Sequence, residues 1–306
     1  MASLGKNALS AAGFGSHAFV RGLLLSWLFA TSGVRSYVDD FRRIMKKVML
    51  AQIPLILALL AAPLLVSATE VEEYFPIRVG ASWTYHISKE RATTVGEKIV
   101  EERITGQSVK RVVKPSDEIS YGAPVYMLSQ HITEENHMTG RKSDVSVESH
   151  VSAEPHQVLL HGQLIRGASR IESSLSRFEP PVAMLKLPIP APGEPFPSVM
   201  RSHGLTVDSR PYERAEETLK TPVGEFRCLR ISSRGPVMGE VPGKPTVTIT
   251  EGSVEATSWF ARGVGLVRQV EVLSLNFELP NGVKTKSEER KVKELSNFVV
   301  PGASFD

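Results

Sequence analysis

Apolar and polar residues alternate over residues 253–274, and this alternation predicts two antiparallel strands joined by a tight turn. In the first strand, one set of alternate positions holds Val254, Ala256, Ser258 and Phe260, and the other holds Glu255, Thr257 and Trp259. Gly263 and Gly265 mark the turn, after which apolar residues are spaced with Arg268, Gln269 and Glu271. We expect the rest of the chain to be organised around this hairpin.

The same period of two recurs on both sides of the hairpin, with charged residues between Val, Ile and Thr, as expected when one sheet face is wet. Thr221-Pro222-Val223-Gly224 and Asn281-Gly282 are turn signals, and residues 235–245 are predicted to form a loop. Residues 171–178 are predicted to form one or two helical turns. Further strands are predicted at 83–88, 98–104, 109–113, 125–132, 145–151, 157–160, 204–208, 214–220, 226–232, 246–252, 275–279 and 285–295. The sequence therefore predicts a mainly β protein with antiparallel strands.

Seven prolines fall in residues 180–197 and permit two interpretations. One is a linker with polyproline II character. The other is a second strand-entry corner, because Leu187-Pro188-Ile189 followed by Gly193 and Phe196 resembles Phe75-Pro76-Ile77 followed by Gly80 and Trp83. The second interpretation divides one sheet system into two sub-halves that meet near residues 180–197.

Residues 45–68 have the form of a Sec-type signal peptide. Met45-Lys46-Lys47 supplies the basic start, residues 48–65 are almost wholly apolar, and Ser67-Ala68 supplies small residues for cleavage after Ala68. The alternative is an uncleaved membrane anchor, since the apolar run is just long enough to span a bilayer. We expect a periplasmic or extracellular bacterial protein, which contacts a membrane only through this helical signal segment if it is uncleaved.

Residues 1–44 precede the signal, although export signals normally begin a chain. We predict that this stretch is an extension and that translation starts at Met45 or Met49. The alternative is a genuine second apolar segment at 18–30. The remainder, 69–306, is then a single β-rich domain, undivided or with the two sub-halves described above.

Net charge argues against a nucleic-acid partner. The whole chain carries 36 Lys and Arg against 33 Asp and Glu, but seven of the basic residues and two of the acidic residues precede residue 69. The remaining 29 basic and 31 acidic residues make the mature body mildly acidic, so it lacks the positive field that attracts nucleic acid.

Cysteine and histidine give no support to a metal site, and no cofactor is expected. Cys228 is the only cysteine, so we predict a packed thiol within strand 226–232 and no zinc–thiolate centre. No histidine pair has the short spacing of a chelate, so surface histidines on wet strand faces are predicted instead of ligands. The six histidines that raise the question are His86, His131, His137, His150, His156 and His161.

Catalytic motifs are also missing from the sequence, and we predict no catalytic residue. There is no Gly-x-Ser-x-Gly elbow, and Gly263-Val264-Gly265 lies between strands, whereas a phosphate-binding loop joins a strand to a helix. The carboxylate pairs Glu101-Glu102 and Glu288-Glu289 are adjacent in strands, so their members point to opposite faces and are predicted to be solvated.

Four aromatic residues are the candidate ligand-binding positions: Trp83, Tyr85, Trp259 and Phe260. They flank turns and strand ends. Aromatic residues in these places either fill a core or line an apolar groove in a curved sheet.

Three motifs carry a family resemblance: residues 74–85 (YFPIRVGASWTY), 221–226 (TPVGEF) and 259–267 (WFARGVGLV). With the signal, they make the chain similar to secreted bacterial β-rich proteins of a domain-of-unknown-function, TapB-like type, which resemble LolA-like periplasmic half-barrels. The resemblance covers about residues 70–295. It implies a strongly curved antiparallel sheet or half-barrel whose concave face holds acyl chains or scaffolds envelope proteins.

Three functional hypotheses follow. The first is a non-enzymatic envelope protein that binds an apolar ligand or lipid or assists envelope assembly. The second is a scaffold that pairs an exposed strand edge with a protein partner. The third is a hydrolase whose site is assembled from scattered residues.

Overall fold

The computed structural model describes residues 70–115, 124–167, 176–188, 196, 198–202, 205–241, 247–279 and 282–302. The predicted extension at 1–44 and signal at 45–68 lie outside these residues. The described part begins with the short helix α3 (Glu70–Tyr74). No helix in these ranges has the length and apolar character needed to cross a membrane.

Thirteen strands follow α3 within the described ranges, and they confirm that the protein is mainly β. Their bounds are β1 (Ser82–Val95), β2 (Lys98–Pro115), β3 (Val125–Asn136), β4 (Arg141–Glu154), β5 (Gln157–Gly167), β6 (Ser176–Lys186), β7 (Val199–Ser202), β8 (Leu205–Asp208), β9 (Arg210–Thr221), β10 (Gly224–Val241), β11 (Val247–Ala261), β12 (Gly265–Glu278) and β13 (Lys284–Val299).

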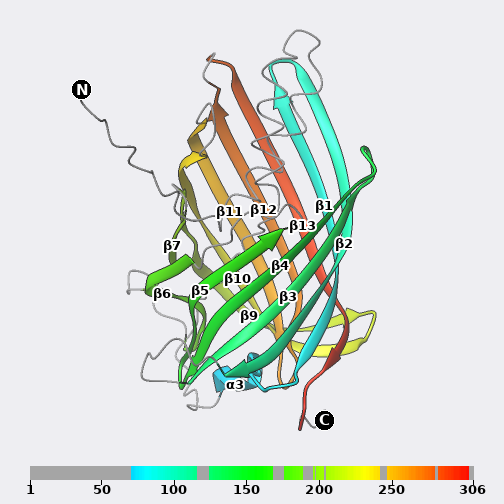
Figure 1. The fold of residues 1–306 in the computed structure, drawn as a ribbon, viewed down its shortest axis with the longest axis vertical. Helices are drawn as coiled ribbons and strands as arrows, with labels where there is room; N and C mark the ends of the chain where they lie inside the picture. Colours follow the sequence, from blue (N-terminus) through cyan, green and yellow to red (C-terminus); the bar gives the residue numbers. More distant parts are fainter. Residues whose placement is uncertain are drawn as a thin grey trace, which may run out of the picture.

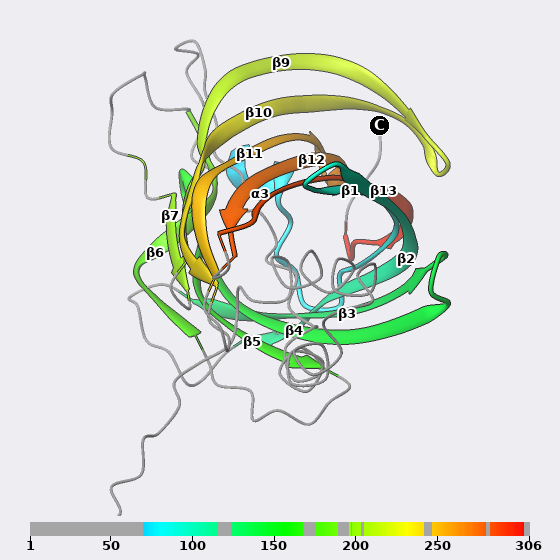
Figure 2. The same ribbon diagram turned by 90° about the horizontal axis from the view of Figure 1, so that it is seen from above.

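All the strand pairs are antiparallel, and they form one sheet in the order β6-β5-β4-β3-β2-β1-β13-β12-β11-β10-β8-β7, with β9 joined to β10. The strands are long and tilted, and α3 lies at the same end of the molecule as the C-terminus (Figure 1). Seen from above, the sheet curves through most of a circle and brings β6 and β7 to the same side (Figure 2). The predicted strongly curved antiparallel sheet is therefore confirmed.

Alternating burial follows from this curvature, because successive side chains point to the two faces of a strand. In β12, buried and more exposed residues alternate from Gly265 to Glu278. Glycine allows close approach of neighbouring strands, for example at Gly106 and Gly252. A Cβ at Gly106 would lie 2.2 Å from the Thr133 carbonyl oxygen, and one at Gly252 would lie 2.4 Å from the Val237 carbonyl oxygen.

The hairpin predicted at 253–274 is present and is longer than predicted, since it comprises all of β11 and β12. Gly263 and Gly265 have φ angles of 71° and 95°, the left-handed region that the turn requires. The turn after Thr221 is also confirmed, because β9 ends there and β10 begins at Gly224.

Several predicted boundaries were wrong. The separate strands at 98–104 and 109–113 are parts of β2, and most of the predicted loop at 235–245 is strand, because β10 continues to Val241 across a register shift between Pro236 and Gly239. Residues 176–178 are strand instead of helix, and Pro180 and Pro181 lie within β6 instead of a linker. Local proline and glycine signals were overridden by pairing with distant strands.

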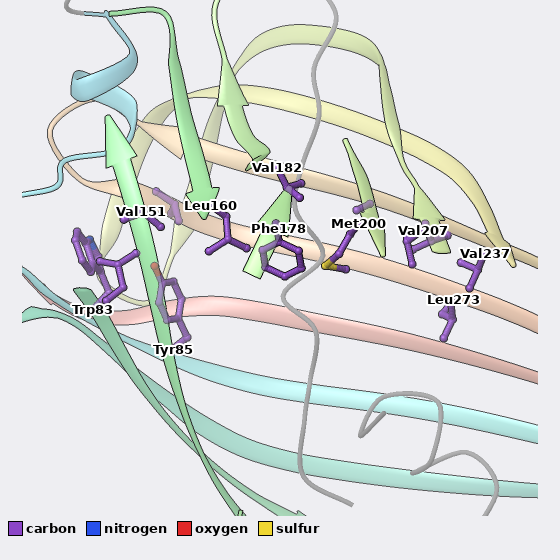
Figure 3. Packing of buried hydrophobic residues seen from close by; sticks show 14 of the residues in the cluster. Trp83, Tyr85, Val151, Leu160, Phe178, Val182, Met200, Val207, Val237 and Leu273 are labelled. Atoms are coloured by element: carbon purple, nitrogen blue, oxygen red, sulfur yellow. The ribbon is translucent and has the colours of Figure 1, made fainter. Parts of the chain in front are cut away.

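Buried apolar side chains run along the inside of the sheet, and we call this set the apolar stripe. Figure 3 shows it extending from Trp83 and Tyr85 at one end to Val237 and Leu273 at the other. Its residues belong to one contiguous core cluster and are at most 8% exposed. The stripe consists of Trp83, Tyr85, Val151, Leu160, Phe178, Val182, Met200, Val207, Val237 and Leu273.

Candidate functional site

The three motifs singled out in the sequence meet around one cleft of about 960 Å³, which we call the end cleft. Residues 72–78 border it on one side, the tip of the β9–β10 hairpin at 223–228 on another, and the β11–β12 turn at 261–264 on a third. Phe298, near the end of β13, completes it. These segments gather at the end of the molecule where α3 and the C-terminus lie (Figure 1).

The floor of the end cleft is apolar. Val223, Phe226 and Phe298 are half-buried, and Val264 is buried. Phe226 and Phe298 meet edge to face, with ring centroids 6.2 Å apart, which is a favourable aromatic geometry. This contact fixes the hairpin tip against β13 and leaves an apolar surface within reach of a ligand.

Charged side chains form the rim, and several of them are paired with one another. Arg262 lies 2.7 Å from Glu73 and donates to the Tyr74 hydroxyl at 3.1 Å. Arg227 is 2.5 Å from Glu216. Since both arginines have acidic partners on the rim, their charges need no ligand to balance them.

The β11–β12 turn is held to α3 from outside and to β1 from inside. Outside, the Gly263 amide donates to the Glu73 carbonyl at 2.8 Å. Inside, the Trp83 indole N–H donates to the Val264 carbonyl at 2.6 Å, and the Tyr85 hydroxyl donates to the Leu266 carbonyl at 3.1 Å. Trp83 and Tyr85 thus position one wall of the cleft.

The other two predicted aromatic residues lie elsewhere. Trp259 is half-buried beside the Glu217 carboxylate, to which its indole N–H donates, and the Arg268 guanidinium lies 5.7 Å from its ring centroid. Phe260 is 3% exposed, in a core cluster with Tyr74. The structure brings Trp83 and Tyr85 together and separates them from Trp259. None of the four predicted residues is among the described residues that line the end cleft.

Sequence reasoning missed the residues that do line the cleft, including Tyr74, Val223, Phe226 and Arg262. All four were within reach, because Tyr74 opens the first motif, Val223 and Phe226 lie in the second, and Arg262 lies in the third. No signal marked Phe298, which reaches the cleft only through the pairing of β13 with β1.

A second polar cluster, the charged belt, lies on the inner wall and consists of Lys89, Arg91, Glu102, Glu134 and Glu289. Lys89 is 2.7 Å from Glu134, and Arg91 is 3.0 Å from Glu102 and 2.5 Å from Glu289. The prediction that Glu102 and Glu289 are solvated was wrong: they are 6% and 1% exposed. Their strand neighbours Glu101 and Glu288 are exposed, as predicted.

Coulombic attraction outweighs burial in the charged belt. Burial alone would raise the pKa of Glu289, but Arg91 and Lys89 hold it below its usual range. Burial alone would lower the pKa of Arg91, but Glu289 and Glu102 raise it. Glu289 and Arg91 are therefore both charged at neutral pH.

Two histidines also differ from the prediction of surface positions, since His150 and His161 are 6% and 2% exposed. His161 shares a hydrogen bond of 2.8 Å with the Ser152 hydroxyl, and burial lowers its pKa. Cys228 is a packed thiol, as predicted, and burial raises its pKa to about 12.

No family model matches the chain, and no curated protein matches it. The TapB-like resemblance therefore stays a prediction.

Solved structures with similarity include a lipoprotein candidate from Parabacteroides distasonis, with 11% identity, 74% of this chain and 98% of that chain covered, and a TM-score of 0.31. A candidate exported protein with a YmcC-like fold from Bacteroides fragilis has 12% identity and a TM-score of 0.26, and the match covers 74% of this chain and 98% of that chain. A DUF1329 family protein from Desulfovibrio piger has 11% identity, coverages of 78% and 92%, and a TM-score of 0.25. TM-scores in this range do not establish a shared fold or function.

Proposed function

We propose that this is an exported, non-enzymatic envelope protein that binds an apolar ligand or lipid in the end cleft. The observation that carries the proposal is the convergence of three distant segments on one open cleft with an apolar floor. Export itself rests on the predicted signal at 45–68.

The dimensions of the end cleft suit a small molecule or an acyl chain. Ligand sites typically enclose about 300–1,000 Å³ and combine an apolar lining with a few polar groups. The end cleft matches this in volume and in its floor, while its rim is more strongly charged. The aromatic floor of Phe226 and Phe298 would contact the apolar body of the ligand. The apolar stripe is the less suitable surface, because its side chains are already packed against one another.

Chemistry at the cleft favours binding over catalysis. Cys228 borders the cleft, but the raised pKa of its thiol leaves almost no thiolate at neutral pH. Glu73 and Glu216 are each engaged by an arginine. These pairings support a holding role, in which the apolar floor supplies the affinity.

The alternative is the strand-edge scaffold, and β9 is the observation that favours it. Within the described residues, β9 pairs with β10 and has its other edge unpaired. However, β9 carries Arg210, Glu213, Arg214 and Lys220 along its length, and charged side chains are a common protection against edge pairing. The end cleft is therefore the better-supported site.

A pair of matched variants tests the proposal. Val223→Asp places a carboxylate in the apolar floor, so it should weaken uptake of a fluorescent fatty acid about tenfold or more. Val113→Asp makes the same exchange at an exposed position on β2 and should leave uptake unchanged. Native mass spectrometry after gentle purification should also show retained ligand in the wild type. Absence of both uptake and retained ligand would contradict the proposal, as would equal uptake by the two variants.

A further inference from the structure

Three lysines on the inner wall, Lys110 on β2 and Lys291 and Lys293 on β13, form what we call the lysine patch. Lys291 and Lys293 are two residues apart in one strand and so share a face. The Lys293 ammonium lies 4.2 Å from the Tyr85 ring centroid, and the Lys110 ammonium lies 5.0 Å from that of Phe75. The patch therefore adjoins the aromatic end of the apolar stripe.

The lysine patch has too few carboxylates to balance it. Glu102, Glu134 and Glu289 are each engaged by Lys89 or Arg91. That leaves Glu271 on β12, which stands directly across from Lys291 in the strand register. Within the part of the chain that the structure describes, no lysine of the patch has a carboxylate oxygen within 4.0 Å. Three lysines facing one carboxylate leave an excess of two positive charges when all are ionised.

Burial makes this imbalance costly. Lys291 is 6% exposed, and its register partner on β1 is Lys89, so two like charges stand directly opposite each other. Glu271 is 2% exposed, and its Oε2 atom has no hydrogen-bond partner among the described residues. Buried charges are normally paired, and the open oxygen of Glu271 needs a donor and not an anion, so it is the lysines of the patch that lack a counter-charge.

Without a counter-charge, the buried Lys110 and Lys293 of the patch hold their protons weakly. Burial lowers the pKa of Lys293 well below its usual range, and the neighbouring Lys110 and Lys291 lower it further. Burial lowers the pKa of Lys110 to about 8. Burial raises the pKa of Glu271 even though Lys291 opposes the shift. The charged or titratable groups facing the patch are thus Lys89 and Tyr85 on β1, Glu271 on β12 and Glu289 on β13.

We propose that the lysine patch binds a doubly charged oxyanion of the sulfate or phosphate type, at a site inside the half-barrel and separate from the end cleft. Ammonium N–H groups donate to such oxygens in charge-assisted hydrogen bonds. Two negative charges would compensate the excess of two positive charges. The same chemistry is offered by a free anion and by the headgroup of an anionic lipid.

Inorganic sulfate is the probe, because it stays doubly charged across the accessible pH range. Calorimetric titration of the full chain should show saturable binding in the wild type and affinity about tenfold weaker in Lys291→Gln. Lys142→Gln removes the same charge from a side chain that is 77% exposed and should bind sulfate as the wild type does. Lys293→Gln serves if Lys291→Gln fails to fold. No saturable heat up to about 10 mM sulfate, or wild-type affinity in a folded patch variant, would overturn the site.

The pH dependence and the source of the anion can be separated in the same experiment. Binding should weaken as pH rises above about 8, because the patch then loses the protons that the anion requires. At neutral to mildly basic pH, where both are mostly doubly charged, octyl phosphate binding more tightly than inorganic phosphate would identify a lipid headgroup, and equal affinity would identify a free anion. Val223→Asp should leave sulfate affinity unchanged, so failure of the end-cleft proposal would not affect this one.

Discussion

Arg91 on the inner wall and Arg230 on the opposite face are both bound by two carboxylates, yet they differ in exposure. The Arg91 side chain is 6% exposed, and its partners Glu102 and Glu289 are 5% and 1% exposed. Neighbouring strands on either side, β2 and β13, supply these partners. Solvent barely reaches these three side chains, so each charge depends on the others.

Arg230 contacts two carboxylates from one strand, β9, in a wetter setting. It binds Glu213 through both terminal nitrogens and lies 3.3 Å from Glu217. Their side chains are 21%, 47% and 41% exposed. The difference shows that similar ion pairs have different roles. The buried pairs of Arg91 allow charged side chains to lie in the inner wall. The exposed pairs of Arg230 add little to stability, because water can replace either partner.

Replacing each arginine by methionine should give the largest difference in stability between the two sites. Arg91→Met leaves Glu102 and Glu289 buried without their cation, so we expect the free energy of unfolding in urea to fall by about 3–5 kcal/mol. Arg230→Met should produce a loss close to the error of the measurement. Equal losses would contradict the distinction.

A triple variant is the control for Arg91. Arg91→Met with Glu102→Gln and Glu289→Gln removes all three charges, so it should recover much of the stability lost by Arg91→Met alone. A triple variant no more stable than the single one would attribute the loss to packing instead of charge.

Trp83 and Trp259 give a smaller version of the same contrast. Trp83→Phe removes a buried donor and leaves the Val264 carbonyl unsatisfied, which should lower the free energy of unfolding by about 1–3 kcal/mol. Trp259→Phe removes the donor to Glu217, whose side chain is 41% exposed and can turn to water, so its effect should be smaller. Chemical denaturation of the two variants side by side measures the difference.

The smallest expected effect concerns Lys110, which should change how the free energy of unfolding depends on pH. Its pKa of about 8 in the folded protein lies below the value of about 10.4 in an unfolded chain, so unfolding takes up a proton between these values. Stability contributed by Lys110 should therefore rise with pH across this window. Lys110→Met should lack that contribution, while Cys228, whose raised pKa acts in the opposite direction, is unchanged in both proteins. If the free energy of unfolding of the wild type and of Lys110→Met changed with pH in parallel, the lowered pKa of Lys110 would be refuted.

The sequence was sufficient for most of the strands, although several of their bounds were wrong, and insufficient for their faces. Alternation identified the hairpin at 253–274 because each strand buries every second residue. The same alternation could not show that Glu102 and Glu289 are buried, since charged residues between apolar ones normally indicate a wet face. Their common partner Arg91 is 198 positions from Glu289, and a pairing at that separation depends on a register that local pattern does not contain.

The sequence identified the segments that form the end cleft, but it did not show that these segments meet at one place. The motifs that contain Tyr74, Phe226 and Arg262 were recognisable, but Arg262 and Tyr74 are 188 positions apart. Trp83 and Tyr85 were selected as ligand-binding residues because they are aromatic and near a turn. Their hydrogen bonds to Val264 and Leu266 show them supporting the turn from behind, and ligand contact by them stays a prediction.

The two ends of the strand order, β6 and β7, face each other without a hydrogen-bonded ladder between them in the described structure. Every other step around the wall is fastened by main-chain bonds, so widening elsewhere would break a ladder. Separation at this seam would break none. Side-chain packing, which places Phe178 and Val182 of β6 in one core cluster with Met200 of β7, therefore joins the two ends, and opening the wall there would cost no main-chain ladder.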